Sequence, residues 1–160
     1  MSLQKEIKQH INSVRHEALL NIVHTANCMD KASGRFFGKF DITEAQYNVM
    51  IVIKLERRKL TQVEISERMV SSRANITSLI DKLEQKGYVR RVAVDGDRRV
   101  YQVELTSAGL RQVDCVERQY VKAVEEMMAG FSGEEARKLS ALLVKARQSL
   151  STVEEVYYDK

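Results

Sequence analysis

Apolar residues recur at helical spacing through much of this chain, most regularly between residues 76 and 83, where they fall at i, i+3, i+4 and i+7. That spacing predicts a helix with one narrow apolar stripe. Ser71 or Ser72 is suited to cap its N-terminus, and Gly87 to end it in the left-handed conformation. The face opposite the stripe carries short or polar side chains: Ala74, Asn75, Thr77, Ser78, Asp81 and Lys82. This face can therefore approach a partner closely and form hydrogen bonds with it.

The hydrophobic period changes directly after this helix. Residues 88–94 and 99–105 are rich in β-branched and aromatic side chains, and the second run alternates apolar with polar positions. The charged residues 95–98 between them predict a β-hairpin with a charged tip. A polar helix followed by a basic hairpin is typical of a winged helix, in which the helix enters the major groove of DNA. The alternative interpretation is a solvated helix face followed by an ordinary surface turn.

Two capping boxes precede the polar helix and predict two further helices. Thr43 and Gln46 begin a helix that we expect to reach about Glu56, and Thr61 and Glu64 begin a shorter one that ends before residue 71. Only a tight turn then separates the short helix from the polar one. This is the spacing of a helix-turn-helix.

Long helices flank this central part of the chain. Apolar spacing predicts one helix over residues 7–40, loosening near residues 33–34. After the hairpin, Thr106 caps another helix, and residues 131–136 repeat the capping box at the start of a last amphipathic helix. These three helices carry more apolar stripe than one small winged helix can cover, so we expect them to pack against a second copy of the chain.

The predicted fold is therefore mainly α with a small β-hairpin wing, a winged helix-turn-helix region joined to a helical dimerisation region. Residues 1–40 are expected to form the N-terminal dimerisation helix and residues 41–106 the winged helix. Residues 107–160 are expected to form the C-terminal dimerisation helices. All three parts belong to one intertwined domain.

Positive charge is concentrated on the predicted winged helix. Residues 54–99 hold 12 Lys and Arg against 7 Asp and Glu, a surplus of +5, which leaves the rest of the chain at −1 of the total +4. Such a basic region indicates a nucleic-acid partner. No segment is apolar for long enough to cross a bilayer, and the N-terminus lacks the apolar core of a signal peptide. We therefore expect a cytoplasmic protein with no membrane partner.

Six motifs occur between Thr43 and Gly109. They are TEAQY at 43–47, LTQ at 60–62, VSSRANIT at 70–77, LEQKGYV at 83–89, DRRVY at 97–101 and LTSAG at 105–109. Together they resemble the MarR (multiple antibiotic resistance regulator) family of bacterial transcription factors. The resemblance covers roughly residues 40–110 in motif detail and the whole chain in helix order. The loop from Arg91 to Asp97 is one residue longer than is common in that family, so the wing tip is expected to sit differently.

The resemblance implies a homodimer that binds a palindromic operator in double-stranded DNA, with one winged helix on each half-site. In the family's wing an aspartate orients an arginine that enters the minor groove, and the matching residues here are Asp97 and Arg99. On the reading helix, Ser71 and Ser72 are expected at phosphates, and Arg73, Asn75 and Thr77 at base edges. The DNA-contacting residues expected in all are Ser71, Ser72, Arg73, Asn75, Thr77, Ser78, Lys82, Asp97, Arg98 and Arg99.

The other basic residues of the winged helix have a simpler interpretation. Solvated surface positions are expected for Lys54, Arg57, Arg58, Lys59 and Arg68. For Arg90 and Arg91 a surface role and a DNA role both stay open.

The resemblance also implies a small aromatic or anionic effector, bound in a cleft between the dimer helices and the winged helix. Phe36, Phe40, Tyr47 and Met50, together with Phe37, are the candidates to line that cleft. Plain core packing is the alternative interpretation for these residues.

Two cysteines, Cys28 and Cys115, lie in helical patterns, and no disulfide is expected. His24 and Cys28 stand at i and i+4 on one helix face, which makes them weak metal candidates without a carboxylate partner. Cys115 is a further candidate ligand from across the interface. Neither a metal nor another cofactor is expected. The reactive cysteine of the family's organic-hydroperoxide branch sits nearer the start of the first helix, so we expect Cys28 to be a buried, inert thiol.

The sequence is thus interpreted as a dimeric, sequence-specific transcriptional regulator, a repressor released by an effector. An enzyme is not expected, because there is no glycine-rich phosphate loop and no paired nucleophile and base. The alternatives are a winged-helix adaptor that binds protein, and a redox- or metal-responsive regulator of the same fold. Activation instead of repression stays open, because nothing in the sequence fixes the sign of regulation.

Overall fold

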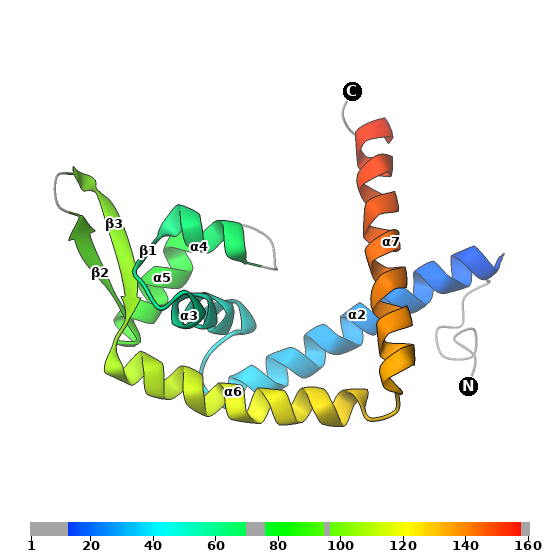
Figure 1. Ribbon diagram of the computed structural model, residues 1–160, viewed down its shortest axis with the longest axis horizontal. Helices are drawn as coiled ribbons and strands as arrows, with labels where there is room; N and C mark the ends of the chain where they lie inside the picture. The colour runs from blue at the N-terminus through cyan, green and yellow to red at the C-terminus, as the bar shows by residue number, and fades with distance from the viewer. Residues whose placement is uncertain (1–12, 70–75, 95–96, 158–160) are drawn as a thin grey trace. The chain divides into compact units, whose positions relative to one another are not determined.

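The computed structural model describes residues 13–69, 76–94 and 97–157, without the side chains of residues 94, 97–100 and 152–157. The elements are α2 (Val14–Gly38), α3 (Glu44–Glu56), β1 (Leu60–Thr61), α4 (Gln62–Arg68), α5 (Ile76–Gln85), β2 (Val89–Val94), β3 (Asp97–Leu105), α6 (Ser107–Met128) and α7 (Gly133–Tyr157) (Figure 1). The chain divides into two compact units, residues 1–116 and residues 117–160, so that the boundary falls within α6. A mainly helical fold with a small antiparallel sheet confirms the predicted fold class.

Both predicted capping boxes in the winged helix are present. The hydroxyl of Thr43 accepts from the backbone N–H of Gln46 at 3.2 Å, and the Gln46 side chain accepts from the backbone N–H of Thr43 at 2.9 Å. Thr61 and Glu64 make the same reciprocal pair at 3.3 and 2.8 Å. The side chains satisfy N–H groups that the first turn of a helix leaves unpaired. These boxes fix where α3 and α4 begin.

Helix α2 runs without a break from Val14 to Gly38. The predicted loosening at Ser33 and Gly34 is wrong. Gly34 has no neighbour within 4 Å of the position a Cβ would take, so no close contact distorts the helix there. The Ser33 hydroxyl donates to Glu44 at the start of α3. Residues 7–12 of the predicted helix lie outside the described residues.

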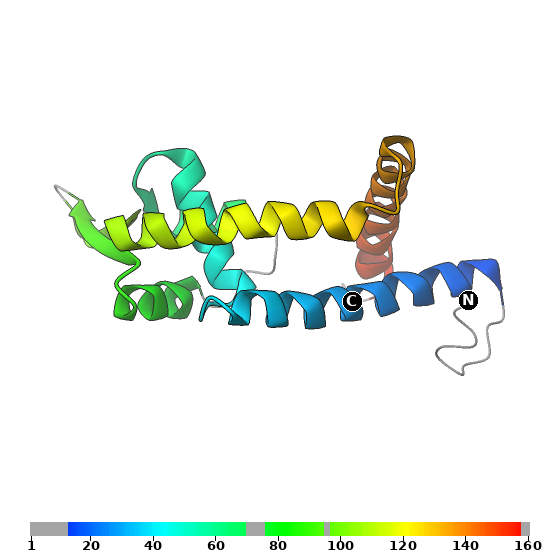
Figure 2. The same cartoon turned by 90° about the horizontal axis from the view of Figure 1, so that it is seen from below.

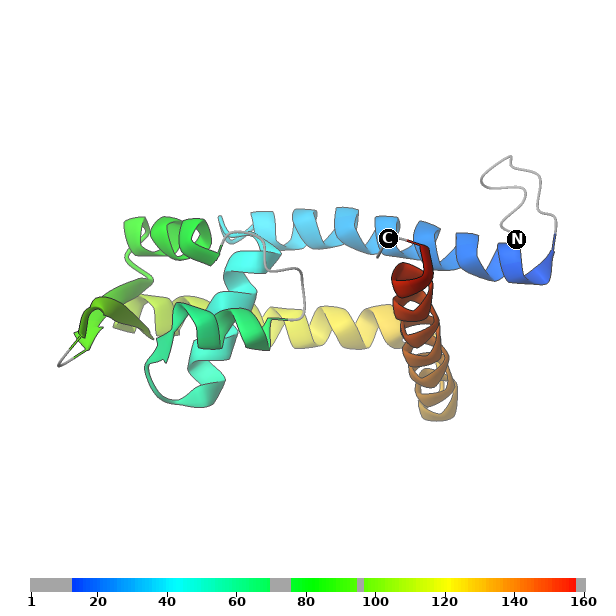
Figure 3. The ribbon, with the colours of Figure 1, turned by 90° about the horizontal axis from the view of Figure 1, so that it is seen from above.

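The sheet has three antiparallel strands in the order β1-β3-β2, not the two that were predicted. Leu60 pairs with Val103, so the short strand β1 lies against β3, on the side away from β2. Val94 pairs with Asp97, which places Asp97 and the residue after it in β3, not in a four-residue tip as predicted. The register shifts between Ala93 and Val94 as a bulge. β2 and β3 project outward from the helices (Figure 1), and the view from above agrees (Figure 3).

One hydrophobic core lies beneath α5 and the sheet. The predicted stripe of α5 faces it, with Ile80 and Leu83 fully buried. The core is formed by Phe37, Ile42, Tyr47, Val49, Met50, Ile53, Leu60, Ile65, Ile76, Ile80, Leu83, Val89, Val103, Val113 and Val116. Its members come from every helix and strand of the first unit, so the core holds α5 and the hairpin in place together.

Hydrogen bonds hold α5, β2 and α6 together where they meet. Gly87 adopts a φ of 70°, as predicted, and the N–H groups of Gly87 and Tyr88 bond to the carbonyls of Glu84 and Leu83 at 2.8 and 2.9 Å. This pattern is a Schellman motif, which ends α5. Thr106 then ties the junction to α6, because its N–H donates to the Tyr88 carbonyl at 3.0 Å and its hydroxyl to the Gly87 carbonyl at 2.6 Å.

The second unit comprises the C-terminal part of α6 and helix α7. Ser132 and Glu135 form the third predicted capping box, with the Ser132 N–H donating to the carboxylate at 2.8 Å. Large apolar side chains of this unit are exposed in the single chain: Tyr120, Val121, Met127, Phe131, Leu139, Leu142, Val144 and Leu150. Among the described residues, no helix combines the length and the apolar character needed to span a membrane.

Candidate nucleic-acid interface

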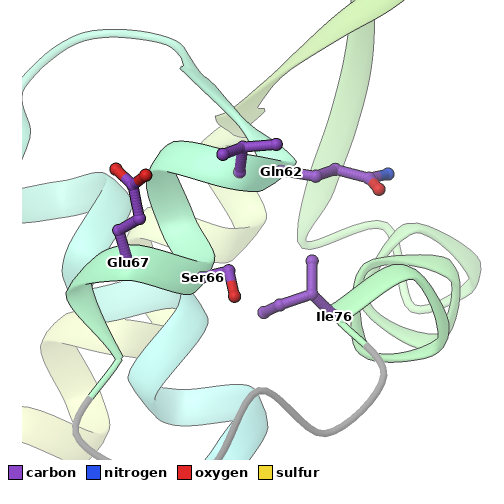
Figure 4. A pocket seen from close by; sticks show the side chains of 5 residues that line it. Gln62, Ser66, Glu67 and Ile76 are labelled. Atoms are coloured by element: carbon purple, nitrogen blue, oxygen red, sulfur yellow. The ribbon is translucent and has the colours of Figure 1, made fainter.

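Helices α4 and α5 form a helix-turn-helix pair, and α3 packs against both. The Thr77 hydroxyl donates to the Gln62 side-chain carbonyl at 3.2 Å, which links the start of α5 to the start of α4. A shallow groove of about 430 Å³ runs along the joint. Figure 4 shows Ser66 of α4 and Ile76 of α5 pointing toward each other in it. The groove is the seam between the two helices.

The polar face of α5 has the exposure that an interface requires. Thr77 and Lys82 are exposed, and Ser78 and Asp81 are half-buried. The remaining predicted contacts on the reading helix, Ser71, Ser72, Arg73 and Asn75, lie outside the described residues. Their contacts with DNA therefore stay predictions.

The hairpin places the predicted wing residues on one strand. Asp97, Arg98 and Arg99 belong to β3, and the structure describes their backbone but not their side chains. Seen from below, the hairpin lies at one end of this unit beside α5 (Figure 2). The backbone thus agrees with a wing, and the contact of Arg99 with a minor groove stays a prediction.

The two arginines that the sequence left open are both paired within the protein. Arg90 donates to Glu104 across the hairpin at 2.5 Å, and this bond holds the pKa of the Glu104 carboxyl below its usual range. Arg91 reaches α5, where its guanidinium binds Asp81 and Glu84, each at 2.5 Å. Burial lowers the pKa of Arg91, but the hydrogen bonds to Asp81 and Glu84 outweigh it, so that its pKa is raised overall.

Four of the five basic residues expected at solvated positions also pair with neighbouring carboxylates. The shortest pairs are Lys54–Asp114 at 2.7 Å, Arg58–Glu64 at 2.7 Å, Lys59–Glu104 at 3.4 Å and Arg68–Glu56 at 2.8 Å. Hydrogen bonds from the Thr61 N–H first, and then from Arg58, lower the pKa of Glu64 to about 2. Sequence reasoning found the charges but not these pairs, because most partners are brought together only by the fold.

The residues proposed to line an effector cleft lie in or against the core. Tyr47 and Met50 are buried together with Phe37, while Phe36 and Phe40 pack on the core from its edge. The Phe37 and Tyr47 rings stand 5.2 Å apart, and the Phe36 and Phe40 rings 5.4 Å apart. These contacts give each residue a packing role, and a role in effector binding stays a prediction.

Cys28 does not have the predicted buried position. It is exposed on α2, because only the C-terminal end of that helix contributes to the core, through Phe37. Its sulfur lies 3.8 Å from Nε2 of His24. Cys115 is half-buried, and both thiols are free. No cluster of three or more potential metal ligands occurs among the residues that the structure describes.

Comparison with known proteins shows which family the chain resembles. Residues 40–100 match the family model described as "MarR family". The HTH-type transcriptional regulator PecS of Dickeya dadantii is 26% identical over 124 residues, which cover 76% of this chain and 75% of PecS. The matched region is the helix-turn-helix and wing described above, and it is similar to that of MarR-family regulators.

Solved structures of MarR proteins share the fold. A MarR-like transcription regulator from Bacillus cereus superposes with a TM-score of 0.73 and 26% identity, covering 85% of this chain and 97% of the other. A cysteine-to-serine mutant of Escherichia coli MarR, solved in complex with operator DNA, gives a TM-score of 0.70 at 24% identity, covering 84% and 99%. The predicted winged helix-turn-helix fold of this chain is thus confirmed.

Proposed function

We propose that this chain is a MarR-family regulator that binds a palindromic DNA operator as a homodimer, with α5 in the major groove and the β2–β3 wing at the adjacent minor groove. The observation that carries the proposal is the pairing of α4 with α5, which leaves Thr77 and Lys82 exposed beside a projecting hairpin. A major groove admits one α-helix, and its base edges accept hydrogen bonds from short polar side chains. The family match and the DNA complex of a MarR of the same fold support this assignment.

The contacts divide by their chemistry. Ser71, Ser72 and the helix N-terminus bind phosphates, and the base-edge contacts come from Arg73, Asn75 and Thr77, with Ser78 and Lys82 at the periphery. In the wing, Asp97 orients Arg99 for insertion into the minor groove, and Arg98 lies beside them. A guanidinium held by a neighbouring carboxylate loses less freedom on insertion than a free one.

The dimer is formed by α2, α6 and α7. Leu19 and Val23 on α2, and Leu142 and Leu150 on α7, leave large parts of their apolar side chains exposed in the single chain. Complete burial of a fully exposed side chain of this kind contributes about 1.5–3 kcal/mol, and these half-exposed side chains contribute about half as much each. Symmetric packing of two copies covers these surfaces and sets two winged helices at the spacing of a palindrome.

Regulation is repression that a small aromatic or anionic effector relieves. Binding near Phe36, Phe40, Tyr47 and Met50 favours a spacing of the two winged helices that does not fit the operator. Such an effector shifts the equilibrium only by its difference in affinity for the two states.

The test compares two duplexes by fluorescence anisotropy. The first carries an inverted repeat from the intergenic DNA beside the coding region, with half-sites about one helical turn apart, and the second is its scrambled counterpart. We expect tight binding of the first duplex only, with affinity falling by about 10³-fold or more between about 50 and 200 mM salt. Equal binding of both duplexes, or affinity indifferent to salt, would overturn the proposal and favour a protein-binding adaptor. Sedimentation equilibrium in the same buffer must give a dimer.

A further inference from the structure

The side chain of Arg91 bridges the wing and the reading helix. Nη1 lies 2.5 Å from Oε2 of Glu84, and Nη2 lies 2.5 Å from Oδ1 of Asp81. The backbone N–H of Arg91 donates to the other Glu84 oxygen at 2.9 Å. Asp81 and Glu84 are three residues apart on α5, so one guanidinium binds two successive turns of the same helix face. Three charge-assisted bonds thus join β2 to α5.

The strand register explains why Arg91 and Arg90 have different partners. Arg91 stands opposite Val103, which is fully buried, so its side chain lies on the inner face of the hairpin and is only 22% exposed. Arg90 stands opposite Glu104 on the outer face and is 69% exposed. Arg90 joins the two strands of the hairpin to each other, whereas Arg91 joins the hairpin to α5.

The bridge also changes the charge that α5 presents. Asp81 lies on the polar face of α5, where an unpaired carboxylate would repel a phosphate backbone. The guanidinium of Arg91 neutralises part of that negative charge. With two carboxylates bound, its own charge is not available to a phosphate.

We propose that Arg91 is a positioning residue that fixes the angle between the wing and α5, so that both approach DNA as one rigid body. This inference rests on the proposed DNA-binding function. A two-stranded hairpin is marginally stable alone and takes its direction from what it packs against. Val94, three residues beyond Arg91, lies about 10 Å further out at about 3.3 Å per residue, so a tilt of about 15° displaces it by about 2.5 Å. That displacement is enough to lose a hydrogen bond at the wing.

The experiment compares Arg91→Met with Arg90→Met in the full-length protein, using the operator duplex and its scrambled counterpart over a series of salt concentrations. For Arg91→Met we expect the ratio of operator to scrambled affinity to fall about tenfold, the effect of losing about 1.4 kcal/mol of coupling. The slope of affinity against salt should not change, because Arg91 contacts no phosphate. For Arg90→Met the ratio should stay as in the wild type, because the partner of Arg90, Glu104, lies on β3 and not on the reading helix.

Two further variants separate positioning from general damage. Arg91→Lys keeps the charge but cannot span both carboxylates, so we expect a smaller fall in the ratio. The double variant Arg91→Glu with Glu84→Arg restores an ion pair with the two charges exchanged. It should recover part of the ratio of operator to scrambled affinity that Arg91→Met loses. A merely structural defect would not be rescued by this exchange.

Amide hydrogen exchange in the free protein supplies a measurement that needs no DNA. We expect the amides of β2 and β3 to exchange faster in Arg91→Met and at the wild-type rate in Arg90→Met. The inference is overturned if Arg91→Met changes neither the exchange rates nor the ratio of operator to scrambled affinity. It is also overturned if Arg91→Met loses affinity equally on both duplexes and the slope of affinity against salt becomes shallower, because Arg91 would then be a phosphate contact. If the wild type binds neither duplex, the proposed function fails, and the exchange rates alone decide whether Arg91 holds the wing.

Discussion

Substitution of Gly109 by alanine tests the junction between the wing and α6. A Cβ built on Gly109 lies 1.9 Å from the Tyr88 carbonyl oxygen and 2.8 Å from its carbon, so the backbone itself must move. Overpacking of this kind costs about 1–3 kcal/mol. The displaced carbonyl also accepts from the Thr106 N–H, and losing that bond adds about 1 kcal/mol. Alanine has a higher helix propensity than glycine, which offsets about 1 kcal/mol or less of this loss in the free energy of unfolding.

The net expectation for Gly109→Ala is a loss of about 1–3 kcal/mol in the free energy of unfolding, or about 2–12 °C in Tm for a chain of this size. Urea denaturation followed by circular dichroism measures it, at one fixed protein concentration because unfolding of a dimer depends on concentration. Gly34→Ala is the matched control. Gly34 is an exposed helical glycine with nothing within 4 Å of a Cβ, so alanine there should stabilise by about 0.5–1 kcal/mol. A Gly109→Ala protein as stable as Gly34→Ala would show that the close contact with Tyr88 is not a real constraint.

Three further outcomes are expected. Glu64→Gln keeps the capping geometry but loses a carboxylate whose pKa is about 2 in the folded protein against an ordinary value of 4.5, so it should be less stable than the wild type at pH 7. In thermal melts this difference in stability should shrink as the pH falls from about 4.5 toward 2. Arg99→Ala should weaken operator binding by at least about 1–2 kcal/mol at matched salt while the dimer stays folded, and an unchanged affinity would count against the wing assignment. Leu142→Lys should give monomers in sedimentation velocity at concentrations where Ser140→Lys, two residues earlier on α7, remains a dimer; a dimeric Leu142→Lys protein would remove α7 from the proposed interface.

Features governed by neighbours in sequence were predicted well. The capping residues Thr43, Thr61 and Thr106 mark the starts of α3, α4 and α6 as expected, because a cap depends on side chains within three or four positions. The end of α5 at Gly87 is equally local, since it needs only one residue that tolerates a positive φ.

Features governed by distant contacts were not predicted. Leu60 and Thr61 form a strand only because β3 lies alongside, and two residues are too few to show an alternating pattern. Which side of α2 stays exposed depends on where the core covers that helix, so the position of Cys28 was misjudged. The ion pairs of Arg91 with Glu84 and Asp81 could not be predicted, because they form only when the fold brings β2 against α5.

Most of the described cations of the winged helix already have a carboxylate within the fold, as Arg58, Arg68, Arg90 and Arg91 illustrate. The far field of the protein is therefore weaker than a count of its basic residues implies, because a closed ion pair acts at long range as a small dipole. We expect such a surface to bind DNA of arbitrary sequence weakly, because non-specific affinity comes from lysines and arginines that are free to neutralise phosphates. Few non-specific sites would then compete with the proposed operator for this protein.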